Sequence, residues 1–200
     1  MTDRQRLVRP GFLDLLHGHM VNAEPRVVDD DALAQAAVAL IVAPDPFSIL
    51  FIKRATRAGD PWSGQMALPG GRAALSDADL RETAVRETRE EVAVALDAGR
   101  YLGQLDDVAP RTPDLPPLMV RPFLFTLPRR ASPRPCTEEV EEAFWLPVAD
   151  LVRPGVYQAV PLTLKGSVRV FPGYQVGPNL VWGLTERIIT PLFRSLGLIP

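Results

Sequence analysis

The chain has 200 residues, of which 46% are hydrophobic and 23% are charged, and its formal net charge at pH 7 is -2. This length is typical of a single globular domain that buries about 70% of its unfolded surface. The near-neutral charge and a sequence pI near 5.7 argue against a broad nucleic-acid-binding surface. A small phosphate ligand needs only a few local cations, so it stays compatible with this composition.

The apolar runs of the sequence are short. The run at 32–43 is too short and too interrupted to span a bilayer, so we expect no membrane segment. The first residues do not lead into the apolar core of a signal peptide. With a single cysteine, Cys136, the sequence excludes an internal disulfide. These features predict a cytoplasmic protein.

The N-terminal part predicts a helix and a strand pair. The 21 prolines of the chain, about twice the average usage, divide it into short elements. A short amphipathic helix is expected at 12–20, followed by strands at 36–42 and 48–54. The apolar pattern of the first strand also fits a helix, but the turn Pro44-Asp45-Pro46 and the β-rich residues after it favour a strand pair.

A turn-rich segment and a second helix follow the strand pair. Either Asp77 or Asp79 can cap the start of this helix, because a side-chain oxygen there accepts from unpaired amide hydrogens. The later elements are predicted as strands at 101–105, 118–127 and 140–146, a short helix at 148–152, short strands at 168–171 and 174–176, and a helix at 180–196 kinked at Pro191. This order predicts an α/β fold with a mixed β-sheet between helices, in one domain of residues 1–200 whose first 31 residues form an extension.

Three glutamates, Glu87, Glu90 and Glu91, lie within five residues of the second helix. At helical spacing of about 100° per residue they share one face, so their charges repel one another. A hard divalent cation removes that repulsion, and Mg²⁺ typically takes one or two protein carboxylates together with waters and substrate phosphate oxygens. The pattern "RETREE" also fits a solvated helix with Arg–Glu pairs, so charge spacing alone leaves both readings open.

Basic residues lie in the same part of the sequence and can hold phosphate or orient the carboxylates. They precede the Pro-Gly-Gly turn, follow it, or flank the glutamates: Lys53, Arg54, Arg72, Arg86 and Arg89.

The Gly-Gly turn followed by "RETREEVAV" at 86–94 resembles the sequence box of the Nudix hydrolase family. The chain departs from that box at three points. Ala93 replaces the terminal glycine, Thr88 stands at an aliphatic position, and the interval from Gly71 to Arg86 is one residue longer. Ala78 therefore occupies the place of the first glutamate, and Asp77 or Asp79 would have to substitute for it.

The longer interval resembles that of the coenzyme A pyrophosphatase-like branch of the family, which carries a second motif directly before the box. The segment 49–72, "ILFIKRATRAGDPWSGQMALPGGR", is similar to that motif at Lys53, Arg54, Gly64, Gln65, Pro69, Gly70 and Gly71. The middle differs, because "RAGDPW" stands where the branch carries a Leu-Arg-x-His type segment. The likeness extends over roughly residues 33–195 and implies a Nudix-type α/β/α sandwich.

The resemblance implies a site for Mg²⁺ or Mn²⁺ formed by Glu87, Glu90, Glu91 and the Gly71 carbonyl, with Arg86 beside the glutamates. The general base is a box glutamate or a distant one, for which Glu138 and Glu139 are candidates. Substrate contacts are expected from Lys53, Arg54, Gln65 and Arg72, from Trp62 as a stacking residue, and from Arg111 or Arg121 as phosphate partners.

Three functional hypotheses follow. The first is hydrolysis of coenzyme A or its thioesters to 3′,5′-ADP and 4′-phosphopantetheine or its acyl form. The second keeps the chemistry but changes the substrate to ADP-ribose, NADH or a modified nucleoside triphosphate, as the altered "RAGDPW" segment suggests. The third is a Nudix-like binding domain without catalysis. A small-molecule substrate is the expected partner in the first two, and a homodimer is compatible with the resemblance because dimers are common in the family.

Overall fold

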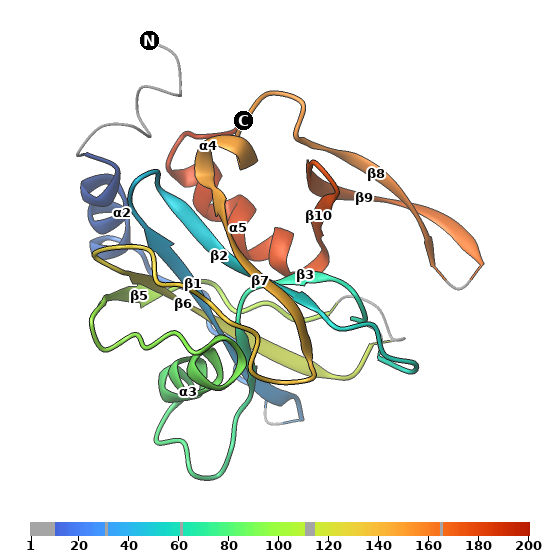
Figure 1. Cartoon of the computed structure of the whole chain (residues 1–200), viewed down its shortest axis with the longest axis horizontal. Helices are drawn as coiled ribbons and strands as arrows, with labels where there is room; N and C mark the ends of the chain where they lie inside the picture. The colour runs from blue at the N-terminus through green and yellow to red at the C-terminus, as the bar shows by residue number, and fades with distance from the viewer. Residues whose placement is uncertain (1–10, 31, 61, 111–114, 165) are drawn as a thin grey trace.

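A mixed β-sheet forms the centre of the computed structural model (Figure 1), which describes residues 11–30, 32–60, 62–110, 115–164 and 166–200. Within these ranges the sheet has seven strands in the order β3-β2-β1-β6-β5, with β4 paired to β1 and β7 paired to β2. Only β1 and β6 run parallel among the paired strands of this sheet. Their bounds are β1 (Ala34–Ala43), β2 (Ser48–Arg54), β3 (Met66–Ala67), β4 (Gly70–Arg72), β5 (Arg100–Gln104), β6 (Leu118–Thr126) and β7 (Val140–Pro147).

Helices cover both faces of this sheet, which confirms the predicted α/β/α sandwich (Figure 1). The helix α3 (Leu80–Val92) lies on one face. The other face carries α2 (Gly11–Val21), α4 (Val148–Leu151) and α5 (Gly183–Ser195). None of the helices in the described ranges is long and apolar enough to cross a lipid bilayer.

Alternation along β1 and β2 divides the core into two layers. Ile41 and Leu50 belong to the cluster under α3, whereas Leu40 and Phe51 belong to the cluster that includes α2 and α5. All four side chains are buried, because a strand covered on both faces has no solvent side. This explains why the apolar run in β1 is continuous and why its period alone also fitted a helix.

A second, smaller sheet was only partly predicted. It contains β8 (Tyr157–Leu164), β9 (Ser167–Val176) and β10 (Asn179–Trp182), in the order β10-β9-β8. The expected break between 168–171 and 174–176 was wrong, since β9 continues through Pro172. The strand tolerates this proline because β10 pairs only with 173–176 of β9, which leaves the edge of β9 free at Pro172.

The last helix starts later than predicted. Residues 180–182 belong to β10, and α5 begins at Gly183 and continues past Pro191 to Ser195. A buried hydrogen-bond network connects α5 to the second sheet: Thr190 bonds to Tyr174 at 2.7 Å and donates to Glu186 at 2.8 Å. The second sheet and α5 therefore form one packed unit at the edge of the pocket described next.

Candidate active site

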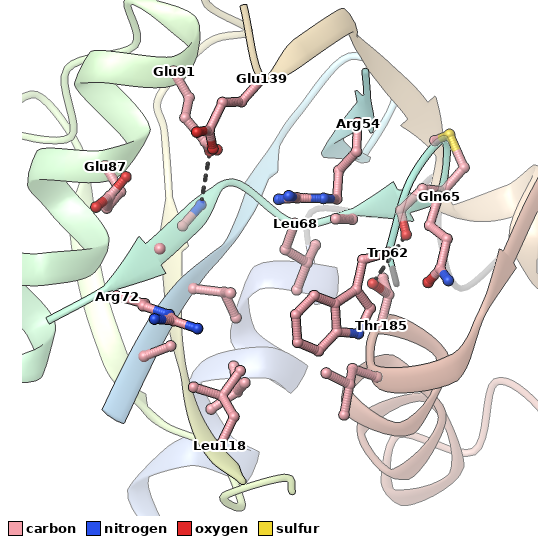
Figure 2. A pocket seen from close by; sticks show the side chains of 18 of the residues that line it. Arg54, Trp62, Gln65, Leu68, Arg72, Glu87, Glu91, Leu118, Glu139 and Thr185 are labelled. Atoms are coloured by element: carbon pink, nitrogen blue, oxygen red, sulfur yellow. Dashed lines mark hydrogen bonds between the residues drawn. The ribbon is translucent and has the colours of Figure 1, made fainter. Parts of the chain in front are cut away.

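A cavity of about 620 Å³ opens between α3, the Gly-Gly turn, the start of β7 and the N-terminal end of α5 (Figure 2). The sequence positions that contribute to it lie far apart, from β1 to α5. Nine of the predicted site residues line it: Arg54, Trp62, Gln65, Gly71, Arg72, Glu87, Glu90, Glu91 and Glu139. The fold thus brings most of the predicted residues together in one place.

The start of α3 is defined by reciprocal contacts. Asp79 is the N-cap, and its Oδ1 accepts from the backbone N–H of Glu82 at 2.8 Å. The Glu82 carboxylate in turn accepts from the backbone N–H of Ala78 at 2.6 Å. These bonds satisfy backbone amide hydrogens at the start of α3, so they determine the residue at which the helix begins.

Asp77 is the aspartate that pairs with the arginine of the box. Its carboxylate, 4% exposed, accepts from Arg86 Nε at 2.8 Å and Arg86 Nη2 at 2.9 Å. The Thr83 hydroxyl and the Ala74 N–H also donate to it. These bonds, above all those from Arg86, hold the pKa of Asp77 far below its ordinary value. Of the two aspartates expected to replace the first box glutamate, Asp77 holds the box arginine and Asp79 caps the helix.

Arg86 connects this anchor to the glutamate face. Its Nη1 donates to Glu87 Oε1 at 2.8 Å and to Glu90 Oε2 at 2.9 Å, and its Nη2 donates to the Arg72 carbonyl at 3.2 Å. Arg86 does not line the pocket. Among the described residues, no three acidic, histidine or cysteine side chains form a ready metal ligand set. Through its own hydrogen bonds, Arg86 orients Glu87 and Glu90 from outside the pocket.

The Gly-Gly turn approaches α3 closely. The N–H of Gly70 donates to Glu91 Oε2 at 2.9 Å, and Gly70 has a φ of 152°, which side-chain-bearing residues rarely adopt. A Cβ on Gly71 would lie 2.6 Å from both carboxylate oxygens of Glu87. Only glycine fits at position 70, and a side chain at position 71 would displace the Glu87 carboxylate, so the turn and the glutamates define one site.

Glu91 lies in an environment that disfavours its charge. Burial, followed by the nearby charge of Glu87 and of Glu139, raises its pKa to about 7, against the lowering effects of the Gly70 N–H and Arg54. A cation among these carboxylates would offset both causes. The glutamates and the Gly71 carbonyl present hard oxygen donors, so the residues fit Mg²⁺ or Mn²⁺.

The lining of the pocket distinguishes the two candidates for the general base. Glu139 lines the pocket, and Figure 2 shows its carboxylate beside that of Glu91; it comes from the turn just before β7. Glu138 is 99% exposed at its side chain, pairs with Arg57 at 3.6 Å and does not line the pocket. Arg57 also lies 3.5 Å from Glu139.

Arg54 and Trp62 form the side of the pocket away from α3. Nη2 of Arg54 donates to Asp60 Oδ2 at 2.9 Å. Trp62 packs against an apolar group that includes Leu118, Val120 and Leu184. Asp60 also lines the pocket, and the sequence analysis did not single it out. Its place in a Gly-Asp-Pro-Trp turn was the available signal, since aspartate in a turn often bonds to the backbone two residues on.

Two predicted substrate residues lie outside the pocket, and a third is not among the described residues. Lys53 alternates away from Arg54 on β2 and lies outside the pocket, where it donates to Glu141 at 2.6 Å. Arg121 is bound to the buried Asp107 through two hydrogen bonds of 2.9 and 2.8 Å, so its guanidinium has a structural partner. Arg111 lies outside the described residues.

Comparison with known proteins supports one family. The NUDIX domain family model matches residues 33–164. Human mitochondrial coenzyme A diphosphatase NUDT8 is 33% identical over 145 residues, which cover 70% of this chain and 59% of that protein. An uncharacterised Nudix hydrolase of Salmonella paratyphi B, NudL, is 30% identical over 167 residues, which cover 83% of this chain and 84% of NudL.

The matched part spans only half of a third relative, an uncharacterised Schizosaccharomyces pombe protein 37% identical over 166 residues and 71% of this chain. Among solved structures, a MutT/nudix family protein from Enterococcus faecalis has a TM-score of 0.57 at 16% identity and covers 98% of this chain and 73% of that one. This likeness concerns the fold. The family model matches most of the chain, and NudL is 30% identical over 84% of its own length, so the chain belongs to the Nudix family.

Proposed function

We propose that this protein is a divalent-metal-dependent pyrophosphohydrolase that cleaves the diphosphate of coenzyme A or an acyl-coenzyme A to 3′,5′-ADP and 4′-phosphopantetheine or its acyl form. The observation that carries the proposal is the buried Glu91, held by the Gly70 N–H beside Glu87 and Glu139. Such a concentration of carboxylates in a pocket is costly unless a cation binds among them, and groups perturbed in this way cluster at functional sites. The likeness to a coenzyme A diphosphatase supports the substrate.

The roles of the residues follow from their positions. Glu87, Glu90, Glu91 and the Gly71 carbonyl would hold Mg²⁺ or Mn²⁺, while Arg86 orients Glu87 and Glu90 through its hydrogen bonds. A divalent cation at such a site neutralises diphosphate oxygens and acidifies a water molecule.

Hydrolysis needs one water per diphosphate. The water oxygen forms a bond to one phosphorus as the bridging P–O bond breaks, and the bridging oxygen leaves with the other phosphate. Glu139 is the residue that we assign to accept the water proton, because it lines the pocket beside Glu91. Arg54 and Arg72 line the same cavity and can bind phosphate oxygens, which adds positioning and charge neutralisation.

A second substrate class is favoured by one feature. The segment 57–62 departs from the coenzyme A branch and contributes Asp60 and Trp62 to the pocket wall. ADP-ribose, NADH or a modified nucleoside triphosphate would keep the same diphosphate chemistry with a different group against this wall. The single-domain organisation, the homodimer and the cytoplasmic location expected from the sequence stay predictions.

Product analysis tests the proposal directly. Purified protein is incubated with Mg²⁺ or Mn²⁺ and equal concentrations of coenzyme A, acetyl-coenzyme A, ADP-ribose, NADH and dGTP, and the products are separated by chromatography. We expect 3′,5′-ADP from coenzyme A with the highest kcat/KM. A higher value for ADP-ribose, NADH or dGTP would support the second class, and no metal-dependent turnover of any substrate would contradict the enzymatic proposal.

A further inference from the structure

Asp60 binds two parts of the pocket wall with one carboxylate. Its Oδ2 accepts from Arg54 Nη2 at 2.9 Å, and its Oδ1 accepts from the backbone N–H of Trp62 at 2.9 Å. The Asp60 carbonyl also accepts from the Ser63 N–H at 3.1 Å. The side chain of Asp60 is 18% exposed and that of Arg54 is 24% exposed, so water competes little for these bonds.

The two partners of Asp60 offer a ligand two different kinds of contact. In Figure 2, Arg54 extends into the pocket between the carboxylates of Glu91 and Glu139 and the ring of Trp62. Its positive charge acts on Glu91. Trp62 belongs to the apolar wall with Leu118. A cation for phosphate oxygens and an aromatic surface for a planar ring thus lie on one wall.

Arg54 depends on Asp60 for its position. Among the described residues Asp60 is the side chain that bonds to the Arg54 guanidinium, and Nε of Arg54 is buried with no hydrogen-bond acceptor. Without Asp60, the guanidinium would lose the contact that fixes its direction. The turn that presents Trp62 would lose the bond from its own N–H in the same step.

We propose that Asp60 is a positioning residue that holds Arg54 and Trp62 on one wall of the pocket, so that losing its charge weakens the binding of a diphosphate and losing both bonds also weakens the binding of an attached base. The inference rests on the site of the proposed function and adds a residue that acts on binding through its two partners. Asp60 does not touch the reacting phosphorus. It acts through Arg54 and Trp62.

Two substitutions separate the two contacts. Asp60→Asn keeps an oxygen that accepts from the Trp62 N–H but removes the charge that holds Arg54, whereas Asp60→Ala removes both. The probes are inorganic pyrophosphate and ADP, which share a diphosphate and differ by the adenosine group. Their dissociation constants are measured by calorimetry with Mg²⁺ for the full chain, so turnover is not needed.

The expected pattern has two levels. Asp60→Asn weakens pyrophosphate and ADP by the same factor, about tenfold, which is the scale of one lost charged hydrogen bond. Asp60→Ala weakens ADP by roughly a further fivefold relative to pyrophosphate, since the Trp62 turn is also released. Asp106→Asn is the matched control: it removes the charge from an Arg–Asp pair, Asp106 with Arg26 at 2.7 Å, which does not line the pocket. Its dissociation constants should stay within about twofold of wild type, the usual range for an exposed pair.

Three results would overturn the inference: both Asp60 variants binding both probes like wild type, both variants losing the two probes equally, or a wild-type protein that binds neither probe. Equal losses would mean that Asp60 only stabilises the loop. The test is independent of hydrolysis. If the expected binding pattern is found in a protein that cleaves none of the substrates, the inference holds and only the proposed function fails.

Discussion

The guanidinium of Arg86 binds the carboxylate of Asp77 through two parallel hydrogen bonds, while its third nitrogen, Nη1, holds Glu87 and Glu90 at 2.8 and 2.9 Å. Asp77 precedes α3 and the glutamates lie on it, so this pairing links the entering loop to the carboxylate face. A buried carboxylate outside the helix therefore determines how the site inside the pocket is oriented.

Replacing Asp77 by Asn should disturb the site without removing a pocket residue. The amide cannot pair with both Arg86 nitrogens, so Glu87 and Glu90 lose their fixed support, and we expect kcat to fall about tenfold or more. Steady-state kinetics with the best substrate measures the effect. Asp79→Asn is the control, since asparagine is as good an N-cap as aspartate. Equal rates for the two variants would contradict the orienting role of Asp77.

Neutralising the box glutamates should abolish most activity with little change in fold. Glu90→Gln and Glu91→Gln are each expected to lower kcat at least ~10²-fold, because each removes a charge that would bind the cation. Glu138→Gln serves as the control, since Glu138 is exposed and lies outside the pocket. Kinetics and circular dichroism are measured together. Wild-type rates in both folded pocket variants would refute the site.

The stability of the metal-free protein should fall as the pH rises from about 4.5 to about 7. The pKa of Glu91 is raised from 4.5 to about 7, so in this window the folded state binds a proton that the unfolded state releases. Below this range the stabilisation from the neutral Glu91 is fully present. Across the range the free energy of unfolding falls by about 3 kcal/mol.

Thermal unfolding with EDTA across this pH range measures the effect on Tm. Mg²⁺ should raise Tm more at pH 7 than at pH 5, because it binds the ionised carboxylate. Glu91→Gln should flatten both dependences. A wild-type Tm with EDTA that rises steadily between these pH values would contradict the raised pKa of Glu91.

The C-terminal end of α3 offers a stabilising substitution. Ala93 is the C-cap residue and has a φ of 56°, in the left-handed region, where the family box carries glycine. Ala93→Gly should therefore raise the free energy of unfolding by about 1 kcal/mol. Ala73→Gly is the control, because Ala73 is exposed and has no positive φ, so it should only destabilise. Chemical denaturation decides, and a loss of stability in Ala93→Gly would count against this account.

Local patterns were enough for the parts of the fold that depend on neighbours in sequence. The amphipathic period and the capping aspartate predicted α3 and its shared glutamate face, and the turn between two β-rich runs predicted β1 and β2. The motif resemblance correctly indicated the family. The strand β8 and the continuous β9 were missed, because prolines interrupt their pattern and edge positions tolerate them only in the assembled sheet.

By itself, the sequence determined the sandwich, the family and the helix that carries Glu87, Glu90 and Glu91, because these depend on periodicity and on short motifs. Only the tertiary structure decided which of two residues that are adjacent in the chain lies in the pocket. Strand alternation points Arg54 into the pocket and Lys53 out of it, and the turn before β7 brings Glu139, not Glu138, to the cavity. Asp60 gained its two partners for the same reason: the loop after β2 folds back on Arg54, and such a contact is set by the path of the chain in space.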